Sequence, residues 1–321
     1  MLFLSLIIPL FNNLEYSKAM FESLIKTIPL NINYEIIFIN DGSSDDTKRW
    51  LESLNSKNFK IIHNETNQGY AKSNNIAVKR AEGDILALLN NDLVFEGDWL
   101  SPMLEILSLS ELKTGIVGNI QYKVSTKEID HAGIELFNKA QFVHKHTVDN
   151  TKNYSRQLAV TGACMLIRKK DFDQVNGFSE VFINGCEDLD LCFKIKSLGK
   201  FIYLSHKSSI QHHVSLTRNL TNIQNEINSR LLLSKWRSLI RQELSQIWSK
   251  ALFNNEELFM NEYFDGKLLI RSPHVASRLI AENLIRREER RWNKLIDKKD
   301  NTKMLNDNCL IKGLRYVESH T

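Results

Sequence analysis

Apolar and polar residues alternate along the first part of the chain in blocks that predict strands and helices in turn. The apolar runs are short and continuous, as in strands covered on both faces: LFLSLII, YEIIFIN, FKIIH and DILALLN. Segments with helical spacing of apolar residues lie between them, beginning with residues 14–26. Strands that alternate with helices over short links are typical of βαβ units. We therefore predict an α/β fold with a mostly parallel central sheet and flanking helices.

Turn and cap residues support these boundaries. The run DGSSDDT follows the second strand and offers several N-cap side chains for a helix that continues to Leu54. The segment AKSNNIAVKRA predicts the next helix. Gly83 is expected at the C′ position of that helix, where glycine tolerates the left-handed conformation.

The pattern loosens after residue 110. Residues 138–157 are polar and irregular, whereas QLAVTGACMLIRK has strand character, and FIYL and SIQHH predict two short strands. CEDLDLCFKIKSLG predicts a helix that opens with acids and closes at Gly199. From Asn219 onward the spacing is helical, with an apolar face formed by Leu232, Trp236, Leu239, Ile240 and Ile247. We predict two domains, an α/β domain at residues 1–218 and a helical C-terminal region at residues 219–321.

Composition narrows the classes of function. The 42 Lys and Arg residues exceed the 38 Asp and Glu residues by four, and this charge is too small to favour a nucleic-acid partner. The four cysteines lack the close-pair spacing of a metal site, which favours a reduced, cytoplasmic chain. The first residues, MLFLSLIIPLFNN, lack a basic segment and have an apolar run too short to cross a membrane, so we interpret them as a strand.

Three predicted strands end in polar residues, at positions 9–12, 40–41 and 90–92. Ligands of parallel sheets bind beyond these carboxyl ends. The first strand lacks the glycine-rich fingerprints of dinucleotide binders and P-loop proteins, so a phosphate ligand would be held by a cation. Mg²⁺ takes one or two carboxylates plus substrate phosphates, an arrangement that Asp92 suits. The alternative is that Asp92 caps the helix containing Trp99.

A second group of acids, Glu187, Asp188 and Asp190, crowds a predicted helix start near Phe182, which we expect to be exposed. The helix macrodipole favours acids at this position whatever their function. A carboxylate held near a bound hydroxyl is also a workable general base. Helical spacing points the three acids in different directions, so only one is expected to face a substrate.

Two histidines, His212 and His213, end the last predicted strand. Imidazole is a good ligand for Mn²⁺-like ions, although a lone histidine is more often structural. The remaining histidines considered lack such a context and are interpreted as structural or surface residues: His63, His131, His144 and His146.

Several segments, taken in their order, resemble the family 2 glycosyltransferases with the GT-A fold. They are SLIIPLFNN, IIFINDGSSDDT, NQGYAKSNNIAVKRAEGDILALLNNDLVFEGDWL, VTGACMLIRKKDFDQVNGFSEVFINGCEDLDLC and SIQHH. The resemblance covers about residues 1–215 and is strongest to bacterial surface-polysaccharide transferases, including rhamnosyltransferase-like ones.

This resemblance implies roles for individual residues. Asp92 in NND would be the metal-binding acid, His212 the late metal or diphosphate ligand, and Asp188 the catalytic base. The nucleotide pocket would be lined by Pro9, Phe11, Asp41, Asn67, Gly69, Asn74 and Asn91. Asn90 departs from the D-x-D pattern by replacing an acid, which leaves less negative charge for the metal.

The reaction implied is a single inverting displacement. A nucleoside-diphosphate sugar would be the donor, Mg²⁺ or Mn²⁺ the cofactor, and a hydroxyl of a glycan or lipid-linked molecule the acceptor. Two alternatives stay open: a nucleotidyltransferase, whose first strand usually ends in a glycine-rich basic loop, and a catalytically silent nucleotide- or sugar-binding module.

The C-terminal region contains a basic segment with apolar residues at helical spacing. Its basic residues are Arg286, Arg287, Arg290, Arg291, Lys294, Lys298, Lys299 and Lys303, and its apolar residues are Leu284, Ile285, Trp292, Leu295 and Ile296. A basic amphipathic helix suggests peripheral contact with anionic lipid at the inner face of the membrane. The alternative is a helix that packs on the protein and exposes its basic face.

Overall fold

The computed structural model describes residues 2–137, 140–213, 222–254 and 273–299. The chain divides into two compact units, one formed by Met1–Glu135 and His144–Asn219 and the other by Leu136–Val143 and Leu220–Thr321. The predicted domain boundary between residues 218 and 219 lies outside the described residues. Lys303 of the predicted basic segment lies outside them as well.

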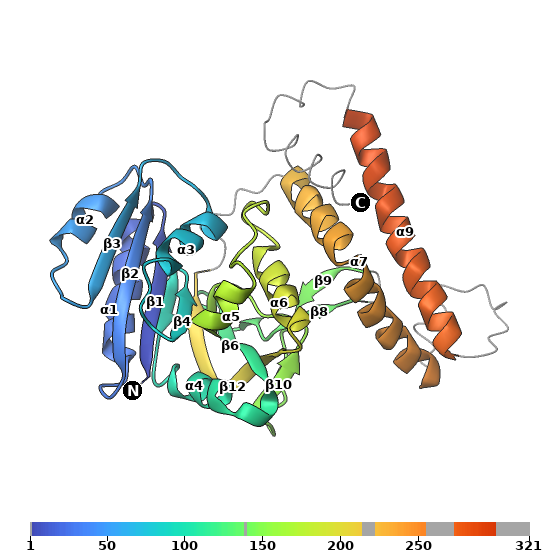
Figure 1. Ribbon diagram of the computed structural model, residues 1–321, viewed down its shortest axis with the longest axis horizontal. Helices are drawn as coiled ribbons and strands as arrows, with labels where there is room; N and C mark the ends of the chain where they lie inside the picture. The colour runs from blue at the N-terminus through green and yellow to red at the C-terminus, as the bar shows by residue number, and fades with distance from the viewer. Residues whose placement is uncertain (1, 138–139, 214–221, 255–272, 300–321) are drawn as a thin grey trace. The chain divides into compact units, whose positions relative to one another are not determined.

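The first unit is built on a large sheet (Figure 1). Its strands are β1 (Phe3–Leu10), β2 (Asn33–Asp41), β3 (Phe59–Asn64), β4 (Ile85–Leu89), β5 (Leu93–Phe95), β6 (Thr114–Lys123), β7 (Ile129–His131), β10 (Tyr154–Gln157), β11 (Cys164–Arg168) and β12 (Phe201–His212). The order across the described sheet is β10-β12-β6-β11-β4-β1-β2-β3, with β5 beside β12 and β7 beside β6. A separate pair is formed by β8 (Ile134–Leu136) and β9 (Phe142–His144).

The sheet has a parallel half, as predicted. β3, β2, β1 and β4 are mutually parallel, and β6 and β12 form a second parallel pair. β11 runs antiparallel between these two groups, so the carboxyl ends of β1, β2, β4 and β12 lie at the edge where β11 begins. The prediction of an α/β fold with a mostly parallel central sheet is confirmed.

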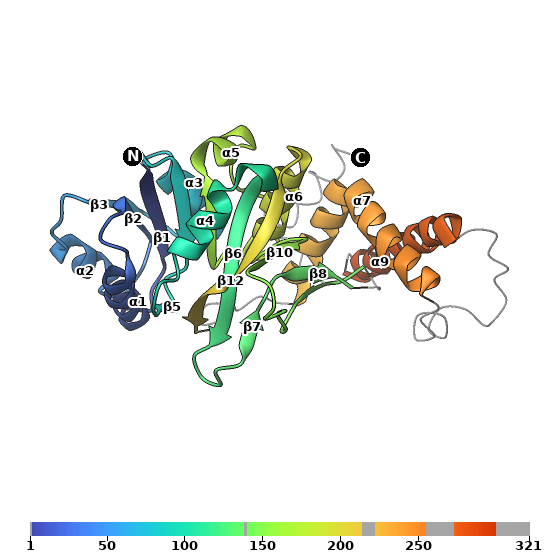
Figure 2. The ribbon, with the colours of Figure 1, turned by 90° about the horizontal axis from the view of Figure 1, so that it is seen from below.

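Helices cover both faces of this sheet. They are α1 (Leu14–Thr27), α2 (Thr47–Ser53), α3 (Tyr70–Val78), α4 (Ser101–Ser108), α5 (Lys169–Gln174) and α6 (Glu187–Ser197), with a short 3₁₀ turn at Ser110–Leu112. Alternate residues of β1, from Leu4 to Leu10, are buried in one hydrophobic cluster with Met20 of α1, Leu51 of α2 and Met103 of α4. Figure 2 shows α3, α5 and α6 on the opposite side of the sheet from α1. Burial of β1 on both faces explains its continuous apolar run.

Two local expectations are wrong. Gly83 does not end the third helix, because α3 ends at Val78; instead the Gly83 N–H donates to Ser5 Oγ at 2.9 Å. A Cβ at Gly83 would lie 2.6 Å from the Ser5 nitrogen, so close packing is what requires glycine there. Phe182 is buried, with 3% of its surface exposed.

The region after residue 110 is more regular than its sequence indicates. The polar stretch 138–157 contains β9 and β10, and the two predicted strands FIYL and SIQHH are parts of one strand, β12. An irregularity in pairing between Ser205 and Ser209 explains why the apolar pattern breaks there. The strand predicted within QLAVTGACMLIRK begins only at Cys164.

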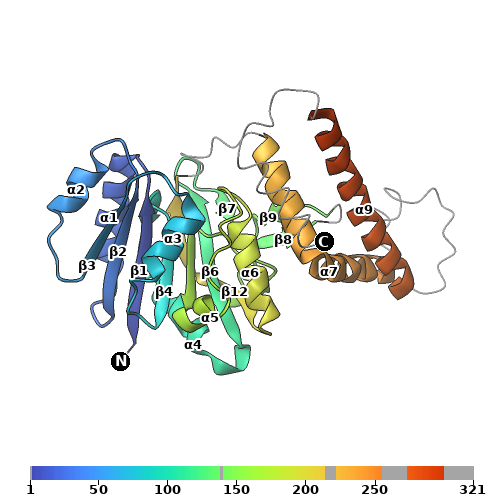
Figure 3. The ribbon, with the colours of Figure 1, turned by 45° about the horizontal axis from the view of Figure 1, so that its top comes forward.

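The second unit contains two long helices, α7 (Asn222–Phe253) and α9 (Pro273–Lys299), which lie side by side (Figure 3). α7 is kinked at Trp236, whose φ of −113° is not helical. Leu284, Ile285 and Trp292 of α9 are buried, so these three residues of the predicted apolar stripe pack inside this unit. Within the described part of the chain, no helix combines the length and apolar character needed to cross a membrane.

Candidate active site

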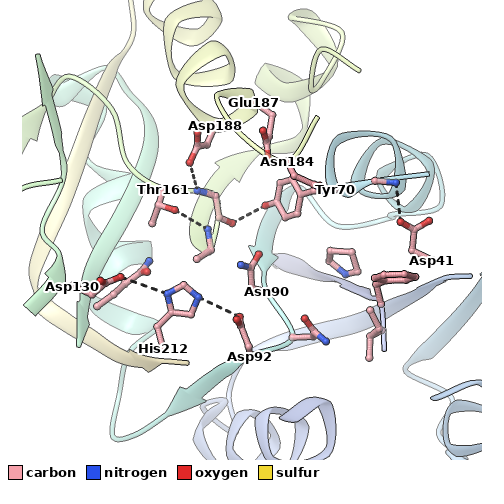
Figure 4. A pocket seen from close by; sticks show the side chains of 18 of the residues that line it. Asp41, Tyr70, Asn90, Asp92, Asp130, Thr161, Asn184, Glu187, Asp188 and His212 are labelled. Carbon is pink, nitrogen blue, oxygen red and sulfur yellow. Dashed lines mark hydrogen bonds and ion pairs between the residues drawn. The ribbon is translucent and has the colours of Figure 1, made fainter. Parts of the chain in front are cut away.

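A cleft of about 290 Å³ opens at the carboxyl ends of the parallel strands. It is lined by nine of the ten predicted site residues: Pro9, Phe11, Asp41, Asn67, Gly69, Asn91, Asp92, Asp188 and His212. The tenth, Asn74, is fully buried and does not line it; its Nδ2 donates to the Tyr70 carbonyl at 2.9 Å. Figure 4 shows Asp92 and His212 on one side of the cleft and Asp188 on the other.

At one end of the cleft, His212 lies between two carboxylates (Figure 4). Its Nε2 is 3.3 Å from Asp92 Oδ1, and its Nδ1 is 3.8 Å from Asp130 Oδ2. Burial lowers the pKa of His212, but the neighbouring carboxylates of Asp130 and Asp92 outweigh this effect and raise that pKa to about 9. The proximity of His212 in turn lowers the pKa of Asp130. At neutral pH the group is therefore an imidazolium between two carboxylates.

Backbone pairing brings Asp92 and His212 together. The β5–β12 register places Leu93 opposite His212, and the His213 N–H donates to the Asp92 carbonyl at 3.0 Å. The alternative in which Asp92 caps the helix containing Trp99 is wrong. Trp99 precedes α4, and the Ser101 N–H at the start of α4 bonds to Asp98 Oδ1 at 2.9 Å.

The donor atoms at this end fit a divalent cation that also binds substrate phosphates. Among the described residues, no three His, Cys, Asp or Glu side chains are grouped closely enough to form a metal site by themselves. Asp92 and His212 offer one oxygen and one nitrogen ligand, and an ion such as Mg²⁺ or Mn²⁺ takes further ligands from a diphosphate and water.

At the other end, Asp188 is held by backbone groups at the start of α6. Its Oδ2 accepts the Gly162 N–H at 3.1 Å, and its Oδ1 accepts the Leu189 N–H at 2.8 Å. The Gly162 carbonyl accepts the Tyr70 hydroxyl at 2.7 Å. Burial and the charges of Glu187 and Asp188 raise the pKa of Tyr70 well above its usual value, so its hydroxyl stays a donor.

The three acids of α6 differ in environment. Asp190 is fully buried and accepts the Ser179 hydroxyl at 2.5 Å, so it faces the protein interior. Glu187 and Asp188 both line the cleft (Figure 4), contrary to the expectation that a single acid faces it. The helix macrodipole favours acids at the start of α6, and their positions around the helix direct two of them toward the cleft.

The part of the cleft formed by residues 41 and 67–69 is ordered by Asp41. Its Oδ1 accepts the Gln68 N–H at 2.8 Å and the Asn64 amide at 2.7 Å, and its Oδ2 accepts the Gly69 N–H at 2.9 Å. Gly42 beside it has a φ of 72°, and a Cβ there would lie 2.6 Å from the Thr66 carbonyl carbon. Asp41 thus fixes the loop at residues 66–69 as well as lining the cleft.

Sequence reasoning missed several cleft residues. Asp130, His144, Tyr70, Gln121, Thr161 and Asn184 line the cleft but were not proposed for the site. The interpretation of His144 as a structural or surface residue is corrected, because His144 lines the cleft. His131 is structural as interpreted, because its buried Nε2 accepts the Gly133 and Thr161 N–H groups at 3.2 and 3.3 Å. A signal available for Asp130 was the adjacent carboxylate and imidazole in the short strand IDH.

Comparisons with known proteins identify the family of the chain. The family described as Glycosyl transferase family 2 matches residues 5–175, more than half of the chain. The chain is 24% identical over 223 residues to Rhamnosyltransferase WbbL of Escherichia coli, covering 56% of this chain and 83% of WbbL. It is 24% identical over 232 residues to O-antigen biosynthesis protein RfbC of Myxococcus xanthus, covering 67% of this chain but only 17% of RfbC.

Solved structures share the architecture. The structure of GalNAc-T7 with UDP, GalNAc and Mn²⁺ is similar with a TM-score of 0.64 and 17% sequence identity, covering 78% of this chain and 50% of that one. The family match, the sheet and this structural likeness confirm the resemblance predicted from the sequence. The chain belongs to glycosyl transferase family 2 and has the GT-A fold.

Proposed function

We propose that the protein is an inverting glycosyltransferase that moves a sugar from a nucleoside-diphosphate sugar to a hydroxyl of a glycan or lipid-linked acceptor. The observation that carries this proposal is that two different groups of side chains lie on opposite sides of the cleft. Asp188, a carboxylate suited to act as a base, lies across it from the Asp92–His212 pair, which is suited to a diphosphate and its cation (Figure 4). A sugar between them would have its leaving group and its attacking hydroxyl on opposite faces.

The proposed donor end is the part of the cleft lined by Pro9, Phe11, Asp41, Asn67 and Gly69. Phe11 is 37% exposed, which leaves its ring accessible for stacking on a nucleobase. The name of WbbL and the UDP and GalNAc bound to GalNAc-T7 support a nucleotide sugar as the donor. The names of WbbL and RfbC support a polysaccharide precursor as the acceptor.

The residues divide the chemistry between them. Asp188 takes the proton from the acceptor hydroxyl, the acceptor oxygen forms a bond to the anomeric carbon, and the bond from that carbon to the diphosphate breaks with its electron pair. The two backbone N–H groups on Asp188 fix its direction before the reaction. At the other end, as long as no cation is bound, the positive charge of His212 opposes the negative charge that develops on the leaving diphosphate.

A divalent cation fits beside the same residues. Asp92 and His212 would hold Mg²⁺ or Mn²⁺, with Asp130 orienting the ring of His212. When bound, the cation supplies further positive charge to the diphosphate. Because His212 must be neutral to ligate a metal, cation binding would release its proton.

A screen of nucleotide sugars tests the proposal. The protein is heated with UDP-, GDP- and dTDP-sugars, each with and without Mn²⁺, and a true donor at 100 times its Kd stabilises the fold by about 2.7 kcal/mol. Donors that stabilise it are then incubated with acceptor glycans, and transfer is followed by mass spectrometry. Binding without transfer to any acceptor would favour the silent binding module, and the absence of stabilisation by every donor would contradict the proposed function.

We also propose peripheral contact between the second unit and an anionic membrane. Part of the apolar stripe of α9 is buried, but a groove between α7 and α9 remains, with Phe253 and Leu279 about 60% exposed. The cationic residues that line this groove are Arg241, Lys250, Arg278 and Arg286, with Glu282 as its only acid among the described lining residues. This combination of exposed apolar and basic side chains suits an anionic lipid surface.

Sedimentation with vesicles tests this contact. The protein should bind vesicles that contain phosphatidylglycerol, bind less as salt is raised, and not bind phosphatidylcholine alone. Charge reversal at two groove residues, Arg241→Glu with Arg278→Glu, should abolish binding. Reversal of Arg156 in the first unit is the matched control, and equal loss in both variants would argue against the groove.

A further inference from the structure

Gln121, on β6, is a buried amide that faces the cleft. Only 1% of its surface is exposed, and it belongs to the residues that line the cleft. Neither its Oε1 nor its Nε2 has a hydrogen-bond partner among the described residues. Gln211 on the neighbouring strand shows the usual arrangement instead, since its amide donates to Glu96 and accepts from Lys127.

A buried amide without partners costs folding free energy, because it gives up hydrogen bonds to water and gains none. Most such groups in proteins are paired, and the exceptions call for an explanation. An apolar side chain of the same size would fill the space beside the cleft at lower cost. The presence of glutamine here is therefore explained best by a polar ligand that enters the cleft.

Strand register locates this amide between the two ends of the cleft. On one edge, Gln121 pairs with His131 of β7, which is next to Asp130 and whose Nε2 accepts the N–H of Thr161, the residue before Gly162. The Gly162 N–H holds Asp188. On the other edge, Gln121 pairs with Ile210, two residues before His212. Gln121 thus lies between the base and the His212 end.

We propose that Gln121 binds hydroxyl groups of the donor sugar and so selects which sugar is transferred. This inference rests on the proposed function, in which the sugar occupies the space between the diphosphate and Asp188. One amide offers a donor and an acceptor side by side, so it can bind two neighbouring hydroxyls of a sugar ring. A sugar with the opposite configuration at one of these carbons leaves half of the amide unpaired, which is a strong basis for discrimination.

The test replaces the amide with a side chain of similar length and no strong hydrogen bonds, Gln121→Met. Donors are first identified for the wild type from UDP-glucose, UDP-galactose, UDP-N-acetylglucosamine, GDP-mannose and dTDP-rhamnose. For the preferred donor, kcat/KM should fall about 10- to 100-fold in the variant, the loss expected for one or two hydrogen bonds. The Kd of the matching nucleoside diphosphate, which lacks the sugar, should stay within about twofold of wild type.

Thermal stability separates binding from packing. Gln121→Met should unfold at the same temperature as wild type or higher, because the variant no longer buries an unpaired amide. Gln211→Met is the matched control: it removes an amide that is already paired, so it should lower the unfolding temperature and leave discrimination among the five donors unchanged.

Three results would overturn the inference. Unchanged kcat/KM in Gln121→Met, with a lower unfolding temperature, would make Gln121 a packing residue. Equal losses for the sugar donor and the nucleoside diphosphate would move its contact from the sugar to the nucleotide. If folded wild type neither binds nor uses any of the five donors, the proposed function fails and this inference fails with it.

Discussion

Replacement of Asp188 by asparagine is the most direct test of the proposed chemistry. The change is nearly isosteric and keeps one carbonyl oxygen for the Leu189 or Gly162 N–H, which Asp188 accepts at 2.8 and 3.1 Å. It removes the negative charge and with it the ability to take a proton. Loss of a general base costs about 10²–10⁴-fold in rate, equivalent to about 3–5 kcal/mol in the barrier.

The effect on stability should be smaller than the effect on rate. One hydrogen bond to a charged group contributes about 1.5–3 kcal/mol, and the variant loses at most one of the two backbone bonds. Asp188 is half-buried and contacts the cleft, so water is available to the new amide. The folded fraction should therefore stay high while kcat falls.

Asp190→Asn is the matched control on the same helix. Asp190 is fully buried, bonds to the Ser179 hydroxyl and lies 3.7 Å from Lys194 Nζ, so its loss should lower the free energy of unfolding by about 1–3 kcal/mol. Below its unfolding temperature this variant should transfer sugar at nearly the wild-type rate. Glu187→Gln belongs in the same series, because Glu187 also lines the cleft.

The assay measures kcat for sugar transfer at saturating donor and the Kd of the nucleoside diphosphate for each variant. Asp188→Asn should lower kcat and leave this Kd unchanged, since the base lies away from the diphosphate. Transfer near the wild-type rate by Asp188→Asn, with an inactive Glu187→Gln, would refute the assignment and move the base by one residue.

Three further predictions follow from other contacts. Asp92→Asn should lower metal-dependent transfer at least about 100-fold without unfolding the protein, and in NMR titration the pKa of His212 should fall below about 9, because one of its two carboxylate partners is gone. Burial lowers the pKa of His131 from 6.5 to about 3, so between these pH values the unfolded chain binds a proton there that the folded chain does not. In urea unfolding, the free energy of unfolding should therefore fall by about 1.4 kcal/mol per pH unit from pH 6.5 toward pH 3. His131→Gln should remove that slope. Arg237→Ala should destabilise the second unit by about 1 kcal/mol or less, because the 2.7 Å ion pair with Glu282 is a third exposed, and a double-mutant cycle with Glu282→Ala should show coupling of that size.

Much of the fold was predictable because its signals are local. The inner parallel strands β1, β2 and β4 are buried on both faces and therefore appear as unbroken apolar runs. β12 was harder to predict, because its pairing irregularity between Ser205 and Ser209 interrupts that run. The helix boundary predicted at Gly83 was wrong, because this glycine is required by a close tertiary contact with Ser5 that no local sequence pattern reveals.

Site residues that stand at strand ends could be predicted from the sequence. Site residues that reach the cleft only through strand pairing could not. Asp92 and His212 stand at strand ends, which the sequence reveals, and both reach the cleft. Asp130 and Gln121 reach it through the pairing of β6 with β7, which depends on contacts far apart in the chain. Asn74 shows the opposite error: its place near the motif suggested the pocket, but helix periodicity turns it toward the core.

The pairing of β5 with β12 also has a consequence for the order of events during synthesis. β12 is the last strand of the described sheet in chain order, and it brings His212 to Asp92. Strands β1 to β4 leave the ribosome much earlier, and their carboxyl ends supply the proposed nucleotide site. Contacts between such distant segments close late, because the chain entropy of a long loop must be overcome first. The nascent protein therefore assembles the proposed diphosphate site only after the scaffold of the proposed nucleotide site, so the complete cleft forms late in folding.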